Sequence, residues 1–175
     1  LTGYLKHLMK NKQLHSINPK NNIFINAWDI LSQNDLTSKI NSSSIAQAIW
    51  KNVDIDLRLE LVKELGGVLK DRTRELSILM ADEIGKPIAQ GESEINKCIW
   101  LFNYYNENAK NNVSINHIET EYFKSYISYE PLGLVLGVMP WNFPFWQVFR
   151  FAIPSLIVGN AVLLKHASNV QGCAN

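Results

Sequence analysis

The sequence predicts an α/β protein in which helices come first and part of a parallel sheet follows. Between residues 37 and 112 apolar side chains recur at helical spacing, whereas from residue 123 the pattern changes to the alternation of strands. Two short, continuous apolar runs at 134–139 and 161–165 then flank a helical stretch at 147–158. Such runs are typical of strands buried in a parallel sheet. The order strand–helix–strand indicates a βαβ crossover, and therefore part of a Rossmann-like, doubly wound sheet.

Four helices are predicted before the strands. The first starts at Thr37 or Ser38 and runs to Lys51, with an inward face made of Ile40, Ile45, Ala48 and Ile49. Asp54 or Asp56 can cap the second, whose apolar face is Leu57, Leu61, Leu65, Val68 and Leu69. The third covers 74–84 and ends at Gly85-Lys86-Pro87, and the fourth covers 88–112 with Ile95, Ile99, Phe102 and Tyr105 inward.

The start of the chain carries weaker signals. Residues 1–15 are expected to be a flexible flank, since lysines occur there without an acidic residue. Asn18-Pro19-Lys20-Asn21-Asn22 predicts a turn, and a short strand is expected at 23–25. The Asn-rich stretch 106–116 predicts a loop, and alternation at 123–129 predicts a half-exposed strand.

Composition excludes several classes of function. The chain has 175 residues, 46% of them hydrophobic and 19% charged, which is typical of a globular domain. A net charge of +1 provides no strong field for nucleic acid or a membrane surface, and the apolar runs are too short to span a bilayer. Cys98 and Cys173 are far apart and indicate no disulfide framework, as in a cytoplasmic protein, and no His or Cys spacing indicates a metal.

One loop carries the clearest chemical signal. In Met139-Pro140-Trp141-Asn142-Phe143-Pro144, two prolines restrict the backbone on either side of a single carboxamide. A rigid, largely apolar setting for one N–H donor suits stabilisation of a developing oxyanion. The alternative is that Asn142 hydrogen-bonds its own turn, as loop asparagines commonly do.

The wider segment resembles the aldehyde dehydrogenase superfamily. The resemblance rests on Tyr129-Glu130-Pro131-Leu132-Gly133, on the loop and Phe145-Trp146-Gln147, and on the stretch 159–169, in this order and spacing. The sequence of these segments is most similar to the succinate-semialdehyde dehydrogenase-like branch, and the similarity extends back through Gly85-Lys86-Pro87 to Ser16. The resemblance implies that 16–118 is the helical part of a cofactor-binding domain. It also implies that 119–131 starts an oligomerisation arm and that 132–175 is the first βαβ unit of an NAD(P)-binding domain.

The resemblance further implies an oxidoreductase that converts an aldehyde to a carboxylic acid through a cysteine thiohemiacetal. Asn142 occupies the position of the oxyanion amide, Met139, Pro140 and Trp141 line the cofactor groove, and Lys165 reaches the adenosine ribose. At Ser168 many NAD-preferring relatives carry Glu, so NADP is expected to be tolerated, with NADP preference as the stronger form of this hypothesis. Alternatives stay open: Ser168 as a helix N-cap, Trp141 as a core aromatic, and Lys165 as a solvated strand end.

Substrate and partner hypotheses follow from the same resemblance. Trp146, Gln147 and Arg150 are candidates for the wall of the substrate funnel, and Arg150 is the only nearby cation that a semialdehyde carboxylate can use. Phe149, Cys98 and His166 are expected to be packed rather than catalytic. A homodimer or tetramer is expected through the exposed strand of the arm.

Neither cysteine matches the nucleophile of the family, which lies downstream together with the glutamate base. The chain is therefore expected to be an N-terminal fragment of an incomplete fold, inactive by itself. The competing interpretation is a non-catalytic truncated product or a helical interaction module.

Overall fold

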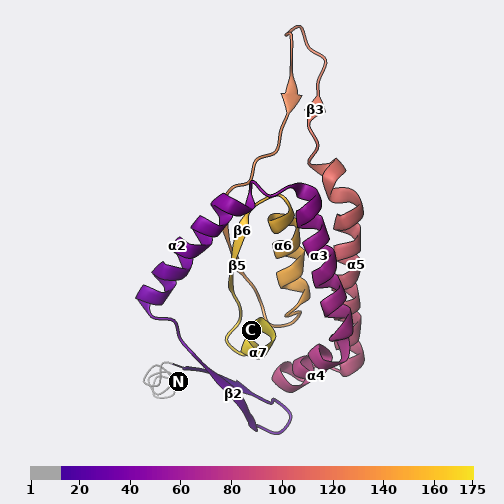
Figure 1. The fold of residues 1–175 in the computed structure, drawn as a ribbon. Coiled ribbons are helices and arrows are strands. Elements are labelled where there is room, and N and C mark those ends of the chain that lie inside the picture. The colour runs from indigo at the N-terminus through magenta and orange to yellow at the C-terminus, as the bar shows by residue number, and fades with distance from the viewer. Residues whose placement is uncertain (1–12) are drawn as a thin grey trace.

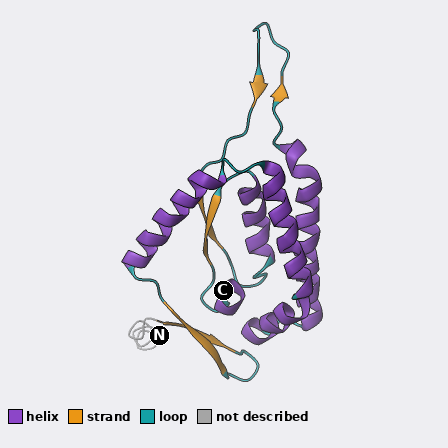
Figure 2. Cartoon of the chain, in the orientation of Figure 1, coloured by secondary structure: helices purple, strands orange, loops and turns teal. Residues whose placement is uncertain are grey.

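The computed structural model describes residues 13–175, which form a helical body, a two-stranded parallel sheet and two antiparallel hairpins (Figures 1 and 2). The predicted α/β class is confirmed by this order of elements. Within the described part, no helix combines the length and the apolar character that crossing a bilayer requires.

The first hairpin pairs β1 (Gln13–Ile17) with β2 (Phe24–Asp29) in antiparallel register. The predicted turn between them is confirmed, because the Asn22 amide donates to the Asn18 carbonyl at 2.8 Å. Sequence reasoning missed β1 and placed only a short strand at 23–25. It was also wrong for residues 13–15 of the expected flank, which pair with β2, while the rest of that flank lies outside the described residues.

Helix α2 (Gln33–Trp50) begins earlier than predicted, because Ser32 and Asp35 form a capping box. The Ser32 hydroxyl accepts from the Asp35 amide at 3.2 Å, and the Asp35 carboxylate accepts from the Ser32 amide at 3.2 Å. The predicted inward face was wrong, since α2 has no buried residue and its exposed positions include Ile40, Ile45, Ala48 and Ile49.

Polar side chains instead attach α2 to the βαβ unit. Gln47 Nε2 donates to the Gly159 carbonyl at 3.0 Å, and Trp50 Nε1 donates to the Leu156 carbonyl at 2.8 Å. Both acceptors lie at the end of α6, so α2 crosses the start of the second strand of the parallel sheet (Figure 1).

Helix α3 (Ile55–Asp71) is capped by Asp54, which accepts from the Asp56 amide at 2.8 Å. The predicted apolar face is only partly right, because of its members Leu69 alone is buried. The core face carries Leu59, Val62 and Leu69, whereas Leu57, Leu61, Leu65 and Val68 are exposed. The close approach of α5 at Gly66 decides between the two stripes, since a Cβ there would lie 3.4 Å from the Phe102 side chain.

Helix α4 (Thr73–Ile84) ends at Gly85, whose φ of +70° is the left-handed conformation that glycine favours at a helix end. Helix α5 (Ile88–Asn112) follows as predicted and replaces the loop expected at 106–112. Together with α3 and α6 these helices form one apolar core, whose most buried members include Met80, Ile95, Cys98, Phe102, Ile153 and Ile157. The expected packing of Cys98 is confirmed.

The βαβ unit consists of β5 (Leu134–Val138), α6 (Trp146–Ile157) and β6 (Ala161–Lys165). The two strands are parallel, with Val138 opposite Lys165 at their carboxyl ends, which confirms the predicted topology. Helix α6 lies so close to β5 that a Cβ at Gly137 would be 2.5 Å from the Phe151 ring. The sheet is not buried on both faces as predicted, because Leu136 and Val138 point away from α6 and are exposed.

A thin arm projects from the body between α5 and β5 (Figure 1). It pairs β3 (Asn116–His117) with β4 (Tyr126–Ile127). The strand predicted at 123–129 is therefore limited to two residues, and both of its faces are exposed. The chain ends in a short helix, α7 (Gln171–Ala174), which packs against α4.

Candidate functional site

The candidate site is the loop of residues 139–145, which continues from the carboxyl end of β5. Its first residue extends the parallel ladder, since the Met139 amide donates to the Lys165 carbonyl at 3.0 Å. Asn142 is exposed, and within residues 13–175 its carboxamide makes no hydrogen bond. Within the described residues the turn therefore does not use this amide, and its role toward a ligand stays a prediction.

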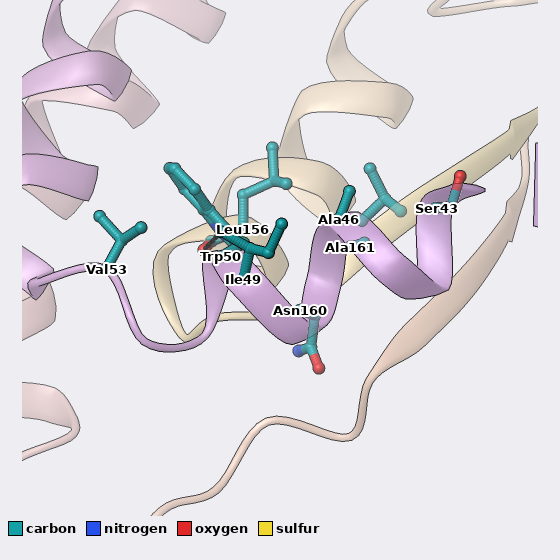
Figure 3. A pocket seen from close by; sticks show the side chains of 9 residues that line it. Ser43, Ala46, Ile49, Trp50, Val53, Leu156, Asn160 and Ala161 are labelled. Atoms are coloured by element: carbon teal, nitrogen blue, oxygen red, sulfur yellow. Dashed lines mark hydrogen bonds between the residues drawn. The ribbon is translucent and has the colours of Figure 1, made fainter. Parts of the chain in front are cut away.

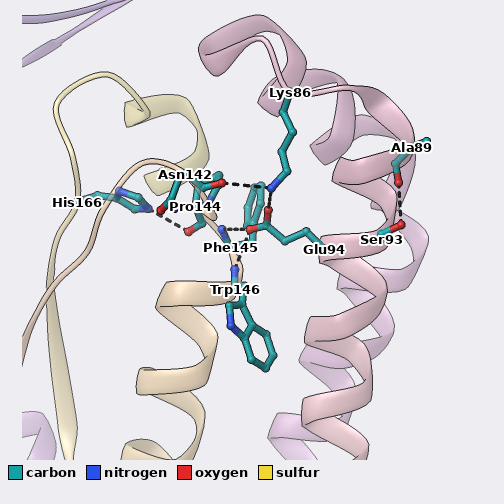
Figure 4. Close-up of polar contacts among 9 residues, drawn as sticks. All are labelled: Lys86, Ala89, Ser93, Glu94, Asn142, Pro144, Phe145, Trp146 and His166. Carbon is teal, nitrogen blue, oxygen red and sulfur yellow. Dashed lines mark hydrogen bonds and ion pairs between the residues drawn. The ribbon is translucent and has the colours of Figure 1, made fainter.

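The main chain around Asn142 is held by a lysine from the turn between α4 and α5. Lys86 Nζ donates to the Asn142 carbonyl at 3.3 Å and lies 4.0 Å from the centre of the Phe143 ring (Figure 4). The same ammonium forms an ion pair with Glu94 of α5. Side-chain exposure is 8% for Lys86 and 1% for Glu94, so this pair is buried beneath the loop.

Glu94 also caps α6 from a different helix. Its Oε1 atom accepts from the amides of Phe145 and Trp146, both at 2.9 Å. No side chain of α6 or its own N-cap residue performs this role. A carboxylate is favourable there because the first amides of a helix are unpaired and carry partial positive charge.

A third anchor reaches the loop from β6. His166 is buried, and its Nδ1 accepts from the Ala167 amide at 2.8 Å. Nε2 is then the protonated nitrogen, and it donates to the Pro144 carbonyl at 2.9 Å. The packed role expected for His166 is confirmed, and this role also ties the loop to the end of the neighbouring strand (Figure 4).

The residues predicted to contact the cofactor gather at the same rim. Pro140, Trp141, Lys165 and Ser168 are exposed and Met139 is half-buried. The core role for Trp141 is wrong, since 52% of its surface is exposed. The N-cap role for Ser168 is also wrong: Val170 is the N-cap of α7 and no N-cap side chain bonds there. Buried Glu83 instead accepts from the amides of Gly172 and Cys173, at 2.8 and 2.9 Å.

The predicted substrate residues lie on α6. Trp146 is half-buried beside the core, Gln147 is half-buried, and Arg150 is exposed. Lys97 Nζ lies 4.1 Å from the Trp146 ring centre, so the expectation that Arg150 is the only cation nearby is wrong. Phe149 packs 5.2 Å from the Phe102 ring, which confirms its core role.

The two thiols are poor nucleophiles. Burial, followed by the nearby Glu94 carboxylate, raises the pKa of Cys98 to about 12. Burial, followed by the Glu83 carboxylate, also raises the pKa of Cys173. A thiol reacts as its thiolate, so neither side chain is prepared to attack a carbonyl carbon.

An apolar hollow of about 410 Å³ lies at the other end of the βαβ unit (Figure 3). Trp50, Ile49 and Val162 contribute to its lining. Two of its polar atoms are already used: Trp50 Nε1 donates to the Leu156 carbonyl, and Asn160 Oδ1 accepts from the Gly133 amide at 2.9 Å. The residues that line this hollow in the described part of the chain include no titratable side chain, in contrast to the loop after β5, which Lys86, Glu94 and His166 contact.

Sequence reasoning missed Lys86 and Glu94, because Gly85-Lys86-Pro87 was interpreted as a helix end and as part of the family resemblance, with no role assigned to the lysine. A signal was present in α5, where Glu94 falls on the same stripe as the core residues Ile95 and Cys98. A carboxylate on a core-facing stripe requires a buried partner, and the turn before the helix supplies one.

Comparison with known proteins gives a consistent result. The model of the aldehyde dehydrogenase family matches residues 7–175. A Synechocystis protein named "Probable succinate-semialdehyde dehydrogenase", with NADP(+) in its name, is 38% identical over 159 residues, covering 91% of this chain and 35% of that protein. An Escherichia coli protein named succinate semialdehyde dehydrogenase, NAD(P)+, is 35% identical, covering 91% of this chain and 34% of that protein.

Solved structures agree with the fold. A succinic semialdehyde dehydrogenase from Streptococcus pyogenes in complex with NADP+ superposes with a TM-score of 0.88 at 25% identity, covering 92% of this chain and 36% of that one. The structure of Gox0499 gives a TM-score of 0.90 at 26% identity, covering 93% and 36%. The chain thus spans about a third of the length of the relatives that it matches.

Proposed function

The chain belongs to the aldehyde dehydrogenase family, and we propose that it supplies the oxyanion amide and part of the nucleotide rim of an NAD(P)-dependent aldehyde dehydrogenase. The observation that carries this proposal is the exposed carboxamide of Asn142, which makes no hydrogen bond within residues 13–175. It lies on a loop whose main chain is held by buried side chains at the carboxyl end of β5. Ligands of open α/β sheets bind outside the carboxyl ends of the strands.

In the proposed reaction, a thiolate attacks the aldehyde carbon and forms a thiohemiacetal, which places negative charge on the former carbonyl oxygen. The Asn142 N–H groups donate to that oxygen. Because the loop is already fixed, no reorganisation is needed when the charge develops. Cys98 and Cys173 are buried thiols with raised pKa values, so the nucleophile must come from another part of the enzyme.

The rim residues fit a nicotinamide dinucleotide. Lys165 presents an exposed ammonium at the end of β6, and Ser168 is an exposed, neutral side chain that caps no helix. An ammonium can bond a ribose hydroxyl or a 2′-phosphate, and a neutral neighbour does not repel that phosphate. Met139, Pro140 and Trp141 would lie along the same groove. When bound, the cofactor supplies the hydride acceptor of the oxidation.

The substrate and the assembly are part of the same proposal. Succinate semialdehyde is the proposed aldehyde, since two relatives are named for it, and the exposed Arg150 on α6 would bind its carboxylate beside Trp146. Residues 119–131 would start the arm that joins subunits into a dimer or tetramer. The two free cysteines support a cytoplasmic enzyme.

The central test uses the polypeptide that contains this chain together with the thiol nucleophile. Formation of reduced NADP is measured with succinate semialdehyde. Asn142→Ala should lower kcat by about 10²- to 10³-fold, as expected for loss of one oxyanion donor. Wild-type turnover by Asn142→Ala would contradict the proposal, and so would turnover by the 175-residue chain alone.

Two further variants test the assigned partners. Ser168→Glu should raise the KM for NADP more than the KM for NAD, because a carboxylate repels the 2′-phosphate. Arg150→Leu should raise the KM for succinate semialdehyde more than that for an uncharged aldehyde. An unchanged ratio in either experiment would remove that residue from its proposed role.

A further inference from the structure

The geometry points to Lys86 and Glu94 as positioning residues for the oxyanion amide, an inference that rests on the proposed function of Asn142. Neither side chain is placed to touch the substrate. Their charged atoms instead hold the peptide groups on both sides of the loop, at Asn142 and at Phe145 (Figure 4).

The two oxygens of Glu94 have separate partners. Oε1 accepts from the Phe145 and Trp146 amides, both at 2.9 Å, and so fixes the end of the loop where α6 begins. Oε2 pairs with Lys86. One carboxylate therefore connects the start of α6 to Lys86, which holds the Asn142 carbonyl in the middle of the loop.

Lys86 acts directly on the residue that carries the amide. Its Nζ donates to the carbonyl of Asn142 itself, at 3.3 Å, and lies against the ring of Phe143. An ammonium has three donors and no acceptor, so its position between Glu94 and this carbonyl constrains the Asn142 peptide plane. A displacement of about 1 Å at a reacting group can cost about 10²-fold in rate, so this constraint affects catalysis through Asn142.

If Lys86 and Glu94 had a purely structural role, replacing them by neutral side chains of similar volume should leave kcat unchanged. A buried ion pair can often be replaced by neutral side chains of similar volume without loss of stability. In Lys86→Met/Glu94→Gln the methionine fills the space of the lysine stem, and the Gln oxygen still accepts from the two amides. The charge pair and the bond to the Asn142 carbonyl are then absent, while the packing and the cap of α6 are retained.

The experiment compares this double variant with Asn142→Ala and with Glu92→Gln in the complete enzyme. Glu92 is a matched control, because it lies on the same helix and pairs with Arg74 at 2.8 Å on the exposed side. We expect the double variant to lower kcat by about 10- to 100-fold with the KM for NADP within about twofold of wild type. Glu92→Gln should leave both unchanged.

A second readout excludes general damage. Alkylation of the nucleophilic thiol by iodoacetamide displaces iodide and forms no oxyanion, so its rate should be unchanged in the double variant. Lys86→Arg provides a second variant: it keeps the charge, but a planar guanidinium that forms two bonds to Glu94 is drawn away from the Asn142 carbonyl. Its kcat should fall at least about threefold at an unchanged thermal midpoint.

The outcomes separate the two levels of the hypothesis. If Lys86→Met/Glu94→Gln or Lys86→Arg is folded and keeps the wild-type kcat while Asn142→Ala is inactive, the positioning role alone is overturned. Alkylation slowed in parallel with kcat would overturn it as well, since the whole site would then be disturbed. Full activity of Asn142→Ala would refute the proposed function, whatever the pair does.

Discussion

The loop that carries Asn142 and the arm of residues 113–132 both connect a regular element to the parallel sheet, but they are held in opposite ways. In the loop, buried side chains bind two carbonyls and two amides, those of Asn142, Pro144, Phe145 and Trp146. In the arm, two strands of two residues each pair with one another, and Phe123 at its tip is fully exposed. One segment is fixed by the core, and the other is independent of it.

Because they are held differently, the two segments are suited to different roles. A group that stabilises a developing charge must be placed in advance, so that no reorganisation is needed during the reaction. An exposed strand edge, by contrast, is a template for pairing with another chain. Chemistry is therefore expected at the loop and association at the arm.

Removing the same side chain in each region gives the largest expected contrast. Glu94→Ala removes the acceptor of two amides and leaves Lys86 buried without its partner, so it should lower the free energy of unfolding by about 3–5 kcal/mol. Glu121→Ala in the arm should change it by at most about 0.5 kcal/mol, because Glu121 is exposed. Urea unfolding followed by circular dichroism measures both values. Equal losses in the two variants would contradict the comparison.

Thiol reactivity provides a second contrast. Cys98 lies one turn after Glu94, and burial together with that carboxylate raises its pKa from 9.0 to about 12. Its thiolate fraction at pH 8 should then be about a thousandfold lower than that of an ordinary thiol, such as Glu121→Cys at the arm. Alkylation followed by mass spectrometry measures the two rates. Rapid labelling of Cys98 in the folded protein would show that the region under the loop opens.

The same pKa shift has a defined sign for stability. The folded state keeps the Cys98 proton at pH values where the unfolded state loses it. The contribution of the neutral buried thiol is therefore complete below pH 9.0 and is lost as the pH rises toward 12. Cys98→Ala should flatten the alkaline decline of the unfolding midpoint, and an unchanged decline would assign it to other groups.

The close contact between β5 and α6 can be tested by adding a methyl group at Gly137. At Gly137 a Cβ would lie 2.5 Å from the Phe151 ring, so Gly137→Ala should cost about 1–3 kcal/mol. Among the described residues, no atom lies within 4 Å of such a Cβ at Gly67 in α3, and Gly67→Ala should instead stabilise by about 0.5–1 kcal/mol. Thermal unfolding of both variants gives the comparison. Tolerance of alanine at position 137 would mean that α6 can move away from β5.

Local pattern predicted the elements whose signals are contained in a short stretch. The parallel pair at 134–139 and 161–165, the Gly85 helix end and the Asp54 cap are of this kind. The inward face of α2 was assigned wrongly, since that helix has no buried residue, and the face of α3 was only partly right, since α3 carries more than one apolar stripe. The choice depends on a distant contact, such as that of Phe102 with Gly66.

The candidate site divides in the same way. The Pro-Trp-Asn-Phe-Pro stretch identified Asn142, because two prolines and one amide form a local signal. Lys86 and Glu94 precede this loop by about fifty residues. The place of Glu94 on a core-facing stripe indicates a buried partner, but the main-chain atoms that the pair holds have no signature in the sequence. The role of the arm follows from resemblance alone, because a two-residue strand pair gives too short a pattern.

The smallest expected effect on stability is at the tip of the arm. Phe123→Ser removes a ring that is fully exposed, so the free energy of unfolding should change by at most about 0.5 kcal/mol. If the arm joins subunits, the same change should weaken association in the complete enzyme, because an exposed aromatic ring is a typical anchor of an interface. Sedimentation velocity over a range of protein concentrations measures this, with Glu121→Ala as the polar control. A dimer fraction that is unchanged in Phe123→Ser would leave the arm without this anchor, while a large loss of stability would show that the arm is part of the folded core after all.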